Sequence, residues 1–339
     1  MQKFATIKKE LLPDTTARKI FGLIRDEMAL VEAEYERQAR SNIQVINYLG
    51  DYLRSSGGKR VRPALLILAN YAVGGNGAGE SAIRLATVME MLHTATLVHD
   101  DIIDNADLRR SRASVNARFG NQTAVLMGDW LYMSAFETSL RERSLEILDI
   151  LTRLTRKMTE GELIQLTMIG RLDITEADYF DILKRKTAYL FSACGEIGAI
   201  LAGASLEQQH AMRDYGMELG IAFQLADDIL DLTSDDEKLG KAAGSDLLEG
   251  KVTLPLIYLL KAEPELRPKF ENVMLTGRYD AISRETIRQK LESLGTVDVI
   301  RDEARRLSAS ARKSLDVLAE SEYRVALEGI PNFVIDRNM

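Results

Sequence analysis

The amino-acid sequence predicts an all-α protein, a single large helical bundle around a central cavity. Only six prolines occur among the 339 residues, and none lies between Pro63 and Pro255, so long helices in that span meet no proline break. Apolar residues recur three and four positions apart, as in Leu85, Val88 and Leu92, which is the spacing of one helix face. Alternating strand patterns and Asn-Gly hairpin turns are scarce.

Glycine-rich and polar segments mark where the expected helices end. In chain order these segments are 57–58, 74–79, 105–120, 170–175, 203–205 and 234–250, and helical segments are expected between them. None of these breaks has the length or composition of an interdomain linker. We therefore expect one domain spanning residues 1–339, with about fifteen N-terminal residues peripheral to it.

A capping signal supports one of these boundaries. The segment from Asp173 to Asp178 offers a capping residue and places acids in a first helical turn, ahead of the apolar Tyr179, Ile182 and Leu183. A helix is therefore expected to begin within this segment.

Composition excludes several classes of protein. A formal net charge of −7 opposes general binding to nucleic acid or to an anionic membrane, because both carry negative charge. The single cysteine, Cys194, cannot form an intrachain disulfide and suits a reducing compartment. No apolar run reaches the roughly 20 residues of a membrane span, and Met1 to Phe4 lack a secretory signal. We therefore expect a cytoplasmic protein without a membrane span.

Two acidic clusters of the same form, Asp100 to Asp104 and Asp227 to Asp231, are the strongest indication of function. In each cluster the first and last aspartates are four residues apart, so on a helix they share a face with Cβ atoms about 5–6 Å apart. Two carboxylates at that spacing repel one another, by a few tenths of a kcal/mol on a surface and more when buried. A bound cation would remove this repulsion, and oxygen-only ligands favour Mg²⁺ or a similar hard ion.

A solvated acidic face is the simpler interpretation of one such cluster, since 28% of the residues are charged. The residues before the clusters argue against it, because Thr94 to Val98 and Gly220 to Ala226 have the composition of a core. Aspartates at the end of a buried apolar stripe indicate the mouth of a lined cavity.

The segment from Gly57 to Pro63 supplies a basic counterpart, because Lys59, Arg60 and Arg62 stand just before an expected helix. Main-chain N–H groups at a helix start and forked guanidinium groups both suit phosphate oxygens. By itself such a run also fits a solvated turn. Other cations follow along the chain: Arg109, Arg110, Lys186, Lys241 and Lys251. Carboxylates, Mg²⁺ and separate cations together describe a site for two diphosphate groups.

These segments together resemble the trans-type polyprenyl diphosphate synthases. The motifs that carry the resemblance run in order from about residue 40 to the C-terminus. They are Gly57 to Pro63, His93 to Arg110, Lys186-Thr187, Phe223 to Asp231, Gly240-Lys241 and Gly250 to Pro255. Several separated motifs in one order are far more specific than a single acidic cluster. The resemblance implies the isoprenoid synthase type of helical bundle and a homodimer.

The resemblance implies a prenyltransferase. In this family an allylic diphosphate loses its diphosphate, the double bond of isopentenyl diphosphate attacks the allylic cation, and loss of a proton leaves a chain five carbons longer. The family pattern implies three Mg²⁺ ions in each site, which bridge the leaving diphosphate. Their ligands would be Asp100, Asp104, Asp227 and Asp231. The second aspartate of each cluster is turned about 100° around the helix and is expected to support these ligands.

The resemblance also divides the basic residues between the two substrates. Around the allylic diphosphate it places Arg109, Lys186, Thr187, Gln224 and Lys241, and it counts Lys186 among the catalytic groups. Around isopentenyl diphosphate it places Lys59, Arg62, His93 and Arg110. His93 precedes Asp100 by two helical turns on the same face, although a buried core histidine would show the same spacing. No side chain is an obvious general base, and in the family the released diphosphate is thought to take the proton.

Product length is expected to depend on the helix that leads into the first cluster. In short-chain relatives a bulky aromatic residue four or five positions before the first aspartate blocks the path of the growing chain. Here these positions are Thr96 and Ala95, and Leu92 and Met91 beneath them are not aromatic. Each residue that lies earlier on this helix adds about 1.5 Å to the depth of the tunnel. Because no aromatic residue closes the tunnel at these positions, we expect a long product of about C35 to C50, used as a quinone side chain. The floor of the tunnel is expected near Leu151.

Four alternative functions share part of this pattern. A short-chain synthase making farnesyl or geranylgeranyl diphosphate shares every catalytic motif, and Ala95 and Thr96 argue only against a farnesyl product. A terpene cyclase or a head-to-head condensing enzyme would leave the segment from Gly57 to Arg62 unexplained. A non-catalytic subunit that shapes a partner's tunnel would not need the complete acidic clusters that this chain carries.

Overall fold

The computed structural model describes residues 17–110, 112–233 and 244–335 and confirms the all-α prediction. The expected peripheral segment at the N-terminus lies outside these residues. The only strands in the described chain are β1 (Leu108–Arg109) and β2 (Arg112–Ala113), an antiparallel pair in which Leu108 lies opposite Ala113. This short hairpin falls in segment 105–120, where the sequence indicates a break between helices.

The helices range from one turn to the 28 residues of α12, and none of those described is both long and apolar enough to cross a lipid bilayer. In chain order they are α2 (Ala17–Gly22), α3 (Arg25–Gln38), α4 (Gln44–Ser55), α5 (Val61–Ala72), α6 (Glu80–Ile103), α7 (Val115–Phe119), α8 (Asn121–Ser139), α9 (Leu145–Met168), α10 (Glu176–Leu183), α11 (Tyr189–Leu201), α12 (Leu206–Thr233), α14 (Ser245–Leu248), α15 (Leu254–Ala262), α16 (Arg267–Thr276), α17 (Arg284–Ser293), α18 (Thr296–Ser314) and α19 (Glu322–Ile335). Short 3-10 turns cover Leu140–Glu142, Pro264–Leu266 and Leu315–Val317, and a π-helical turn, η2, covers Lys184–Ala188.

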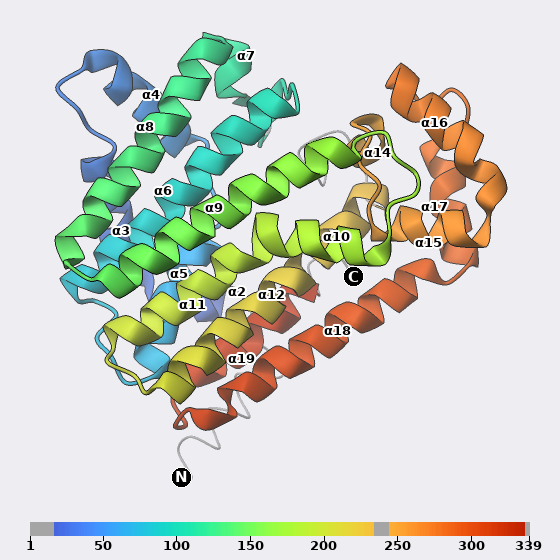
Figure 1. Cartoon of the computed structure of the whole chain (residues 1–339). Coiled ribbons are helices and arrows are strands. Elements are labelled where there is room, and N and C mark those ends of the chain that lie inside the picture. Colours follow the sequence, from blue (N-terminus) through green and yellow to red (C-terminus); the bar gives the residue numbers. More distant parts are fainter. Residues whose placement is uncertain (1–16, 111, 234–243, 336–339) are drawn as a thin grey trace.

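Two long helices, α6 and α12, organise the bundle (Figure 1). Helix α6 packs along α8 and against α5, and α12 packs against α11 and α18. Helix α5 is buried continuously from Ala64 to Ala69, as expected for a helix that is apolar on all sides. The carboxylates at the ends of α6 and α12 are therefore held by helices that are anchored in the core.

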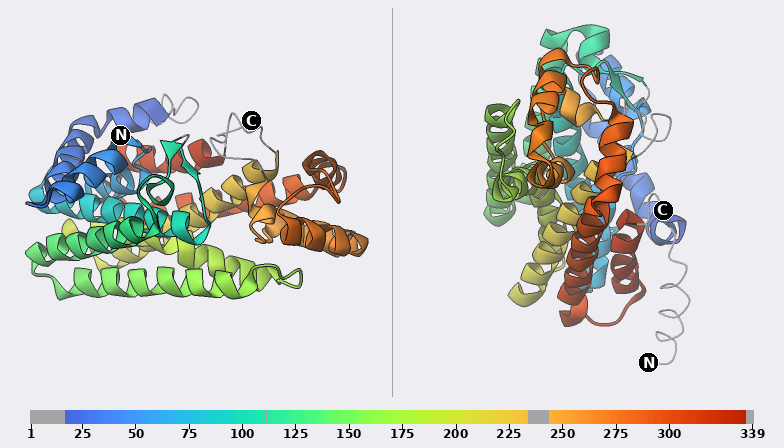
Figure 2. Two further views of the ribbon diagram at one scale, coloured as in Figure 1. Left: turned by 90° about the horizontal axis from the view of Figure 1, so that it is seen from above. Right: turned by 90° about the vertical axis from the view of Figure 1, so that its right-hand side faces the viewer.

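Two clusters of buried apolar side chains fill the described chain, and α12 contributes to both. Its first half supplies Met212 and Leu219 to a cluster built mainly from α3, α5, α6, α8, α9 and α11. Its second half supplies Leu225 and Ile229 to a cluster that includes α10 and α15 to α18. Figure 2 shows α15, α16 and α17 together at one end of the elongated molecule. The second acidic cluster thus lies where α12 enters the second core.

The predicted helix start near Asp173 is confirmed. Thr175 caps α10: its hydroxyl accepts a hydrogen bond from the Asp178 N–H at 3.2 Å, and the Asp178 carboxylate accepts one from the Thr175 N–H at 3.0 Å. This reciprocal pair satisfies donors that a helix start otherwise leaves unpaired. The predicted breaks at Gly170 and Gly203 also follow helix ends, with left-handed φ values of +78° and +66°.

The sequence does not signal the break between α8 and α9. There Arg143 adopts a left-handed conformation with a φ of 52°, and the Ser144 hydroxyl caps α9 by accepting a hydrogen bond from the Ile147 N–H at 3.3 Å. Neither glycine nor proline marks this turn, so the helical pattern continues through it in the sequence.

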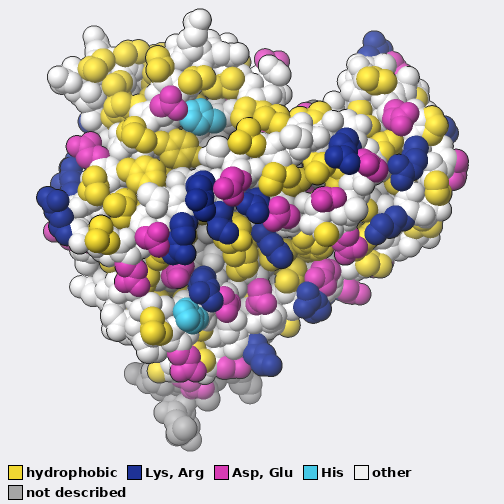
Figure 3. Space-filling model, viewed as in Figure 1, with side chains coloured by type: hydrophobic (Ala, Val, Ile, Leu, Met, Phe, Trp, Pro, Cys, Tyr) yellow, Lys and Arg dark blue, Asp and Glu magenta, His cyan; other side chains and the backbone are white. Residues whose placement is uncertain are grey.

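The outer face of α8 carries several exposed apolar side chains. Val125, Leu126 and Met133 are 41%, 68% and 63% exposed. Figure 3 shows apolar side chains gathered over the part of the molecule where α8 lies. An apolar helix face of this kind is typical of a surface that a partner covers.

Candidate active site

The two acidic clusters lie at the C-terminal ends of α6 and α12. Helix α6 ends at Ile103 with Asp104 as its C-cap, and α12 ends at Thr233, just after Asp231. The C-terminal end of a helix carries partial negative charge and disfavours carboxylates. Both helices therefore place several carboxylates where a cation would stabilise them.

In the first cluster, two aspartates bind basic side chains. The buried Asp101 accepts a hydrogen bond from Arg109 Nε at 2.8 Å and another from Nη2 of the same guanidinium. Asp104 accepts a hydrogen bond from Lys251 Nζ at 2.8 Å. Although burial acts to lower the pKa of Lys251, the charges of Asp104 and Glu249 raise it above its usual value, so this lysine stays charged.

The surroundings of Asp100 stabilise its negative charge only in part. Burial raises the pKa of Asp100 to about 7, and the nearby positive charge of Lys186 offsets this effect only in part. Lys186 itself forms an ion pair with Glu162, with an Nζ–Oε2 distance of 2.6 Å. The negative charge of Glu162 also raises the pKa of Asp100.

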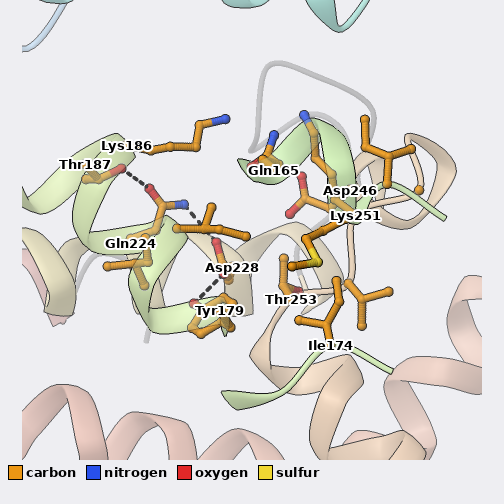
Figure 4. Close-up of a pocket in the computed structure, with 16 residues that line it drawn as sticks. Gln165, Ile174, Tyr179, Lys186, Thr187, Gln224, Asp228, Asp246, Lys251 and Thr253 are labelled. Atoms are coloured by element: carbon orange, nitrogen blue, oxygen red, sulfur yellow. Dashed lines mark hydrogen bonds between the residues drawn. The ribbon is translucent and has the colours of Figure 1, made fainter. Parts of the chain in front are cut away.

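A chain of hydrogen bonds holds the second cluster (Figure 4). Asp228 accepts a hydrogen bond from the Tyr179 hydroxyl at 2.6 Å and one from Gln224 Nε2 at 2.8 Å. Gln224 Oε1 in turn accepts one from the Thr187 hydroxyl at 2.9 Å. Burial raises the pKa of Asp228 to about 7, although both hydrogen-bond donors lower it. Both oxygens of this carboxylate thus already have protein partners.

A cavity of about 170 Å³ lies beside this hydrogen-bond chain. Lys186, Lys251 and Asp228 line it, and apolar side chains such as Ile174 form other parts of its wall (Figure 4). Two lysines that come from the α10–α11 turn and from the segment before α15 therefore border the same space.

The basic segment before α5 lies beside α6. Arg60 has a left-handed φ of 49° and pairs with Glu32 at 2.5 Å and with Glu90 at 2.8 Å. The guanidinium carbon of Arg62 lies 4.8 Å from the ring centroid of Phe191, and Arg62 Nε is buried without a hydrogen-bond acceptor. A buried N–H donor without an acceptor is a group that a phosphate oxygen could satisfy.

His93 and Arg110 complete this basic region. Burial, together with the positive charges of Arg62 and Arg110, lowers the pKa of His93 well below its usual value, so its ring is neutral at pH 7. Arg110 donates a hydrogen bond to the carbonyl oxygen of Gly57. A cavity of about 40 Å³ is lined by Gly57, Glu90 and Arg110, among other residues.

The structure brings the predicted residues together in two neighbouring groups. The first contains both acidic clusters with Arg109, Lys186, Thr187 and Gln224, and the second contains Arg62, His93 and Arg110. Burial lowers the pKa of Arg62, and the nearby charges of Glu90 and Asp227 act against this effect, so Arg62 lies close to Asp227 and links the two groups. Lys59 is exposed in the turn before α5, and Lys241 lies outside the described residues.

The predicted tunnel residues lie on the buried side of α6. Met91, Leu92 and Ala95 are at most 1% exposed, and Thr96 donates a hydrogen bond from its hydroxyl to the His93 carbonyl oxygen at 2.7 Å. Leu151, the predicted floor, is fully buried on α9. The contribution of these residues to product length stays a prediction.

Sequence reasoning missed several partners at these sites. Glu162 pairs with Lys186, Tyr179 donates to Asp228, and Glu90 lies among the basic side chains. Glu90 could have been found, because it lies one helical turn before His93 on the same face. The sequence indicates Lys251 only as one of several cations, within the motif from Gly250 to Pro255. No spacing in the sequence indicates that Glu162 pairs with Lys186 or that Tyr179 donates a hydrogen bond to Asp228.

The donor set fits Mg²⁺. The candidate ligands are carboxylate oxygens, and the Lys251 ammonium that bonds Asp104 shows that a positive charge is accommodated there. Within the described residues, no three acidic, histidine or cysteine side chains form a complete metal site. Mg²⁺ at phosphate sites takes one or two carboxylates and completes its shell with phosphate oxygens and water. Pairs of aspartates such as Asp100 and Asp104 match that requirement.

Comparison with known proteins adds independent information. Residues 43–290 match the sequence pattern of the polyprenyl synthetase family. The octaprenyl diphosphate synthase of Escherichia coli strain K12 is 38% identical over 321 residues, which cover 94% of this chain and 98% of the relative. A geranylgeranyl diphosphate synthase of Methanosarcina mazei is 36% identical over 291 residues, which cover 84% of this chain and 88% of the relative.

A solved structure agrees over nearly the whole chain. It is the crystal structure of a polyprenyl synthase from Caulobacter crescentus CB15, complexed with calcium and isoprenyl diphosphate. It is 34% identical to this chain, has a TM-score of 0.90, and covers 95% of this chain and 98% of its own. The chain therefore belongs to the polyprenyl synthetase family and is a prenyltransferase.

Proposed function

We propose that this chain is a long-chain all-trans polyprenyl diphosphate synthase. It would add isopentenyl diphosphate units, head to tail, to an allylic diphosphate such as farnesyl diphosphate. The observation that carries the proposal is the pair of aspartate clusters that end α6 and α12 beside Lys186 and Lys251. Such a site stabilises the negative charge that develops on a leaving diphosphate.

The allylic diphosphate would bind beside the two acidic clusters. The proposed Mg²⁺ ligands, for three ions, are Asp100, Asp104, Asp227 and Asp231, and bound Mg²⁺ would supply Lewis-acid stabilisation of the departing diphosphate. Lys186 contributes a fixed positive charge, and the Gln224 amide has a second N–H besides the one that it donates to Asp228. The Thr187 hydroxyl donates to Gln224 Oε1 and would hold this amide in place beside the diphosphate. Arg109 is oriented by its hydrogen bonds with Asp101, and Lys241 would complete the set.

Isopentenyl diphosphate would bind at the basic region. The unsatisfied Nε–H of Arg62 is available to a phosphate oxygen, and Lys59 and Arg110 add charge. Because the pKa of His93 is low, its neutral ring would contribute a hydrogen bond and no charge. Most side chains in this region are cations or hydrogen-bond donors, and its carboxylate, Glu90, is paired with Arg60 at 2.8 Å, which supports the released diphosphate as the acceptor of the proton.

A long product, octaprenyl in particular, is supported by the small side chains on α6. Ala95 is fully buried and Thr96 is half-buried, so α6 itself places no aromatic ring between Asp100 and the deeper Leu92 and Met91. The octaprenyl relative also covers more of this chain than the geranylgeranyl relative does, 94% against 84%. A chain of this length would serve as the side chain of a quinone.

A product-length assay tests this proposal. The purified chain would be incubated with Mg²⁺, farnesyl diphosphate and labelled isopentenyl diphosphate, and the chains resolved after removal of the phosphates. We expect products of about C35 to C50, because the path past Ala95 is not blocked by an aromatic ring. Products that stop at C15 or C20 with shorter primers would show a short-chain synthase. The absence of condensation with any primer would indicate the non-catalytic subunit.

We further propose that the chain forms a homodimer through α8. The apolar side chains of Val125, Leu126 and Met133 support this surface, since their burial would favour association. Replacing Leu126 with glutamate is expected to reduce the molar mass, measured by light scattering, from that of a dimer to that of a monomer. Leu275→Glu, at an 87% exposed leucine on α16, is the matched control and should leave the mass unchanged. A Leu126→Glu variant that remains dimeric would place the interface elsewhere.

Binding of Mg²⁺ should depend on pH around neutrality. Because burial raises the pKa of Asp100 to about 7, a proton competes with the metal below that pH. The metal-free fold favours the protonated carboxyl, so this residue lowers stability as the pH rises from about 4 to about 7. We therefore expect the Mg²⁺-induced increase in melting temperature to be larger at pH 8 than at pH 6. An Asp100→Asn variant should lose this difference, and an unchanged pH profile in that variant would contradict the assignment.

A further inference from the structure

The π-helical turn η2, Lys184–Ala188, carries both Lys186 and Thr187. It connects α10 directly to α11 and packs against α9 on one side and α12 on another. A π turn is rare and usually appears as a single turn inserted in an α-helix. Its presence at this position suggests that the neighbouring helices hold it.

A glycine on α9 lies against the outer side of this turn. A Cβ atom added at Gly161 would lie 2.5 Å from Arg185 Cβ and 3.4 Å from the Lys186 backbone nitrogen. Real Cβ atoms do not approach that closely, so η2 would have to move if any other residue stood there. Gly161 has no positive φ, so the glycine is not required by its own backbone conformation.

A second glycine, on α12, faces the other end of the turn. A Cβ atom added at Gly220 would lie 2.6 Å from Ala188 Cα and 3.1 Å from Ala188 Cβ. Glycine inside a helix is less favourable than alanine, because it loses more conformational entropy on folding. Both helices therefore carry a residue that weakens them locally and that permits the close approach of η2.

The close approach brings η2 to its two polar partners. Glu162, next to Gly161, pairs with Lys186 at 2.6 Å. Gln224, about one turn after Gly220 on α12, accepts the hydrogen bond from Thr187 at 2.9 Å. Each glycine thus stands beside the group that orients one of the two side chains. A shift of η2 away from either helix would lengthen the corresponding contact.

We propose that Gly161 and Gly220 are positioning residues that set the location of Lys186 and Thr187 for binding of the allylic diphosphate. The inference rests on the proposed function for its substrate. The packing of η2 against these glycines is expected to affect the binding of one substrate only. Weaker binding is expected for the allylic diphosphate and not for isopentenyl diphosphate, whose proposed site lies at Arg62 and His93.

The test is the Gly161→Ala variant. A displacement of about 1 Å at a group that orients a substrate can reduce function by up to a hundredfold, so we expect KM for farnesyl diphosphate to rise by about ten- to a hundredfold. KM for isopentenyl diphosphate should change by less than about twofold, since no contact to its site is altered. Affinity for inorganic diphosphate in the presence of Mg²⁺, measured by calorimetry, is a second readout that does not require turnover. Gly220→Ala should also raise the KM for farnesyl diphosphate and weaken the binding of inorganic diphosphate. Its added Cβ would in addition lie 3.2 Å from Phe191 Cβ, next to Arg62, so the comparison of the two KM values is made with Gly161→Ala.

Gly198→Ala is the matched control. An added Cβ there would lie 2.5 Å from the Leu66 carbonyl oxygen, the same separation as at Gly161, but between α11 and α5. This variant should lower the melting temperature as Gly161→Ala does and leave both KM values unchanged. Equal effects of Gly161→Ala and Gly198→Ala on the KM for farnesyl diphosphate would overturn the proposal, because general loss of stability would then explain them.

A compensating variant covers the case in which Gly161→Ala fails to fold. Arg185→Gly removes the Cβ atom that an alanine at position 161 would meet, so the double variant Gly161→Ala/Arg185→Gly is expected to recover the wild-type KM for farnesyl diphosphate. Arg185→Gly alone measures the loss of the Arg185 ion pairs with Glu160 and Asp181. A folded double variant that keeps the raised KM would reject the positioning role.

The proposed function and this inference fail in different ways. A wild-type chain that condenses no primer rejects the function, and the affinity for inorganic diphosphate then still decides the role of the two glycines. An active wild type whose glycine variants bind diphosphate normally rejects the inference alone.

Discussion

Replacing Asp100 with asparagine is expected to reduce kcat by about a thousandfold, which corresponds to about 4 kcal/mol of transition-state stabilisation. The change keeps the shape of the side chain and removes its charge, so a proposed Mg²⁺ ligand at the leaving diphosphate would be lost. Because burial raises the pKa of Asp100 to about 7, the neutral amide should not destabilise the metal-free fold. Steady-state kinetics at saturating substrate and Mg²⁺, with a thermal melt of each variant, measure the two effects separately.

Two further variants show whether the effect belongs to the site. Asp149→Asn removes an exposed carboxylate on α9 that pairs with Arg153 at 2.8 Å, and activity should be unchanged because such surface pairs contribute little. Asp101→Asn should have an intermediate effect, since this residue orients Arg109 and is not a proposed metal ligand. An Asp100→Asn variant with nearly full activity would show that the first cluster does not hold the metal.

Replacing Ala95 with phenylalanine is expected to shorten the product from about C35–C50 to about C15–C20 when a primer shorter than farnesyl diphosphate is supplied, while condensation itself continues. Ala95 is fully buried on α6, between the acidic cluster and the deeper Leu92 and Met91. An aromatic ring there would occupy the space that the growing chain has to enter, only about one and a half turns from Asp100. Chromatography of the dephosphorylated products gives the length distribution directly.

Overpacking alone has to be separated from this effect, because an added ring in a core typically costs about 1–3 kcal/mol. Ala304→Phe provides the comparison, since Ala304 is 2% exposed on α18 in the second core cluster. It should lower the melting temperature and leave the product length unchanged. An Ala95→Phe variant that still makes full-length chains would mean that the product does not pass Ala95.

The sequence predicted the helical architecture because its evidence is local. Helix periodicity, the absence of prolines from Pro63 to Pro255, and the capping signal at Thr175 all depend on residues a few positions apart. The acidic clusters could be assigned to helix faces for the same reason. The break at Arg143 was not predicted, because no glycine or proline marks it, although Arg143 adopts a left-handed conformation there.

Contacts between distant segments could not be predicted. Lys251 reaches Asp104, and Tyr179 reaches Asp228, from elements far away in the chain. The π turn at Lys186 likewise has no signature in the sequence, since its conformation depends on the two helices that hold it.

The sequence by itself determined that this protein is helical and that it gathers carboxylates in two clusters, because both properties are carried by residue types at short spacing. It also showed the resemblance to one enzyme family, through the order of several short motifs along the chain. The tertiary structure alone decided which charges face one another. The pKa of Asp100, the pairing of Lys186 with Glu162 and the close approach at Gly161 all arise from burial and from packing between helices. These interactions depend on distances in space, which spacing along the chain does not specify.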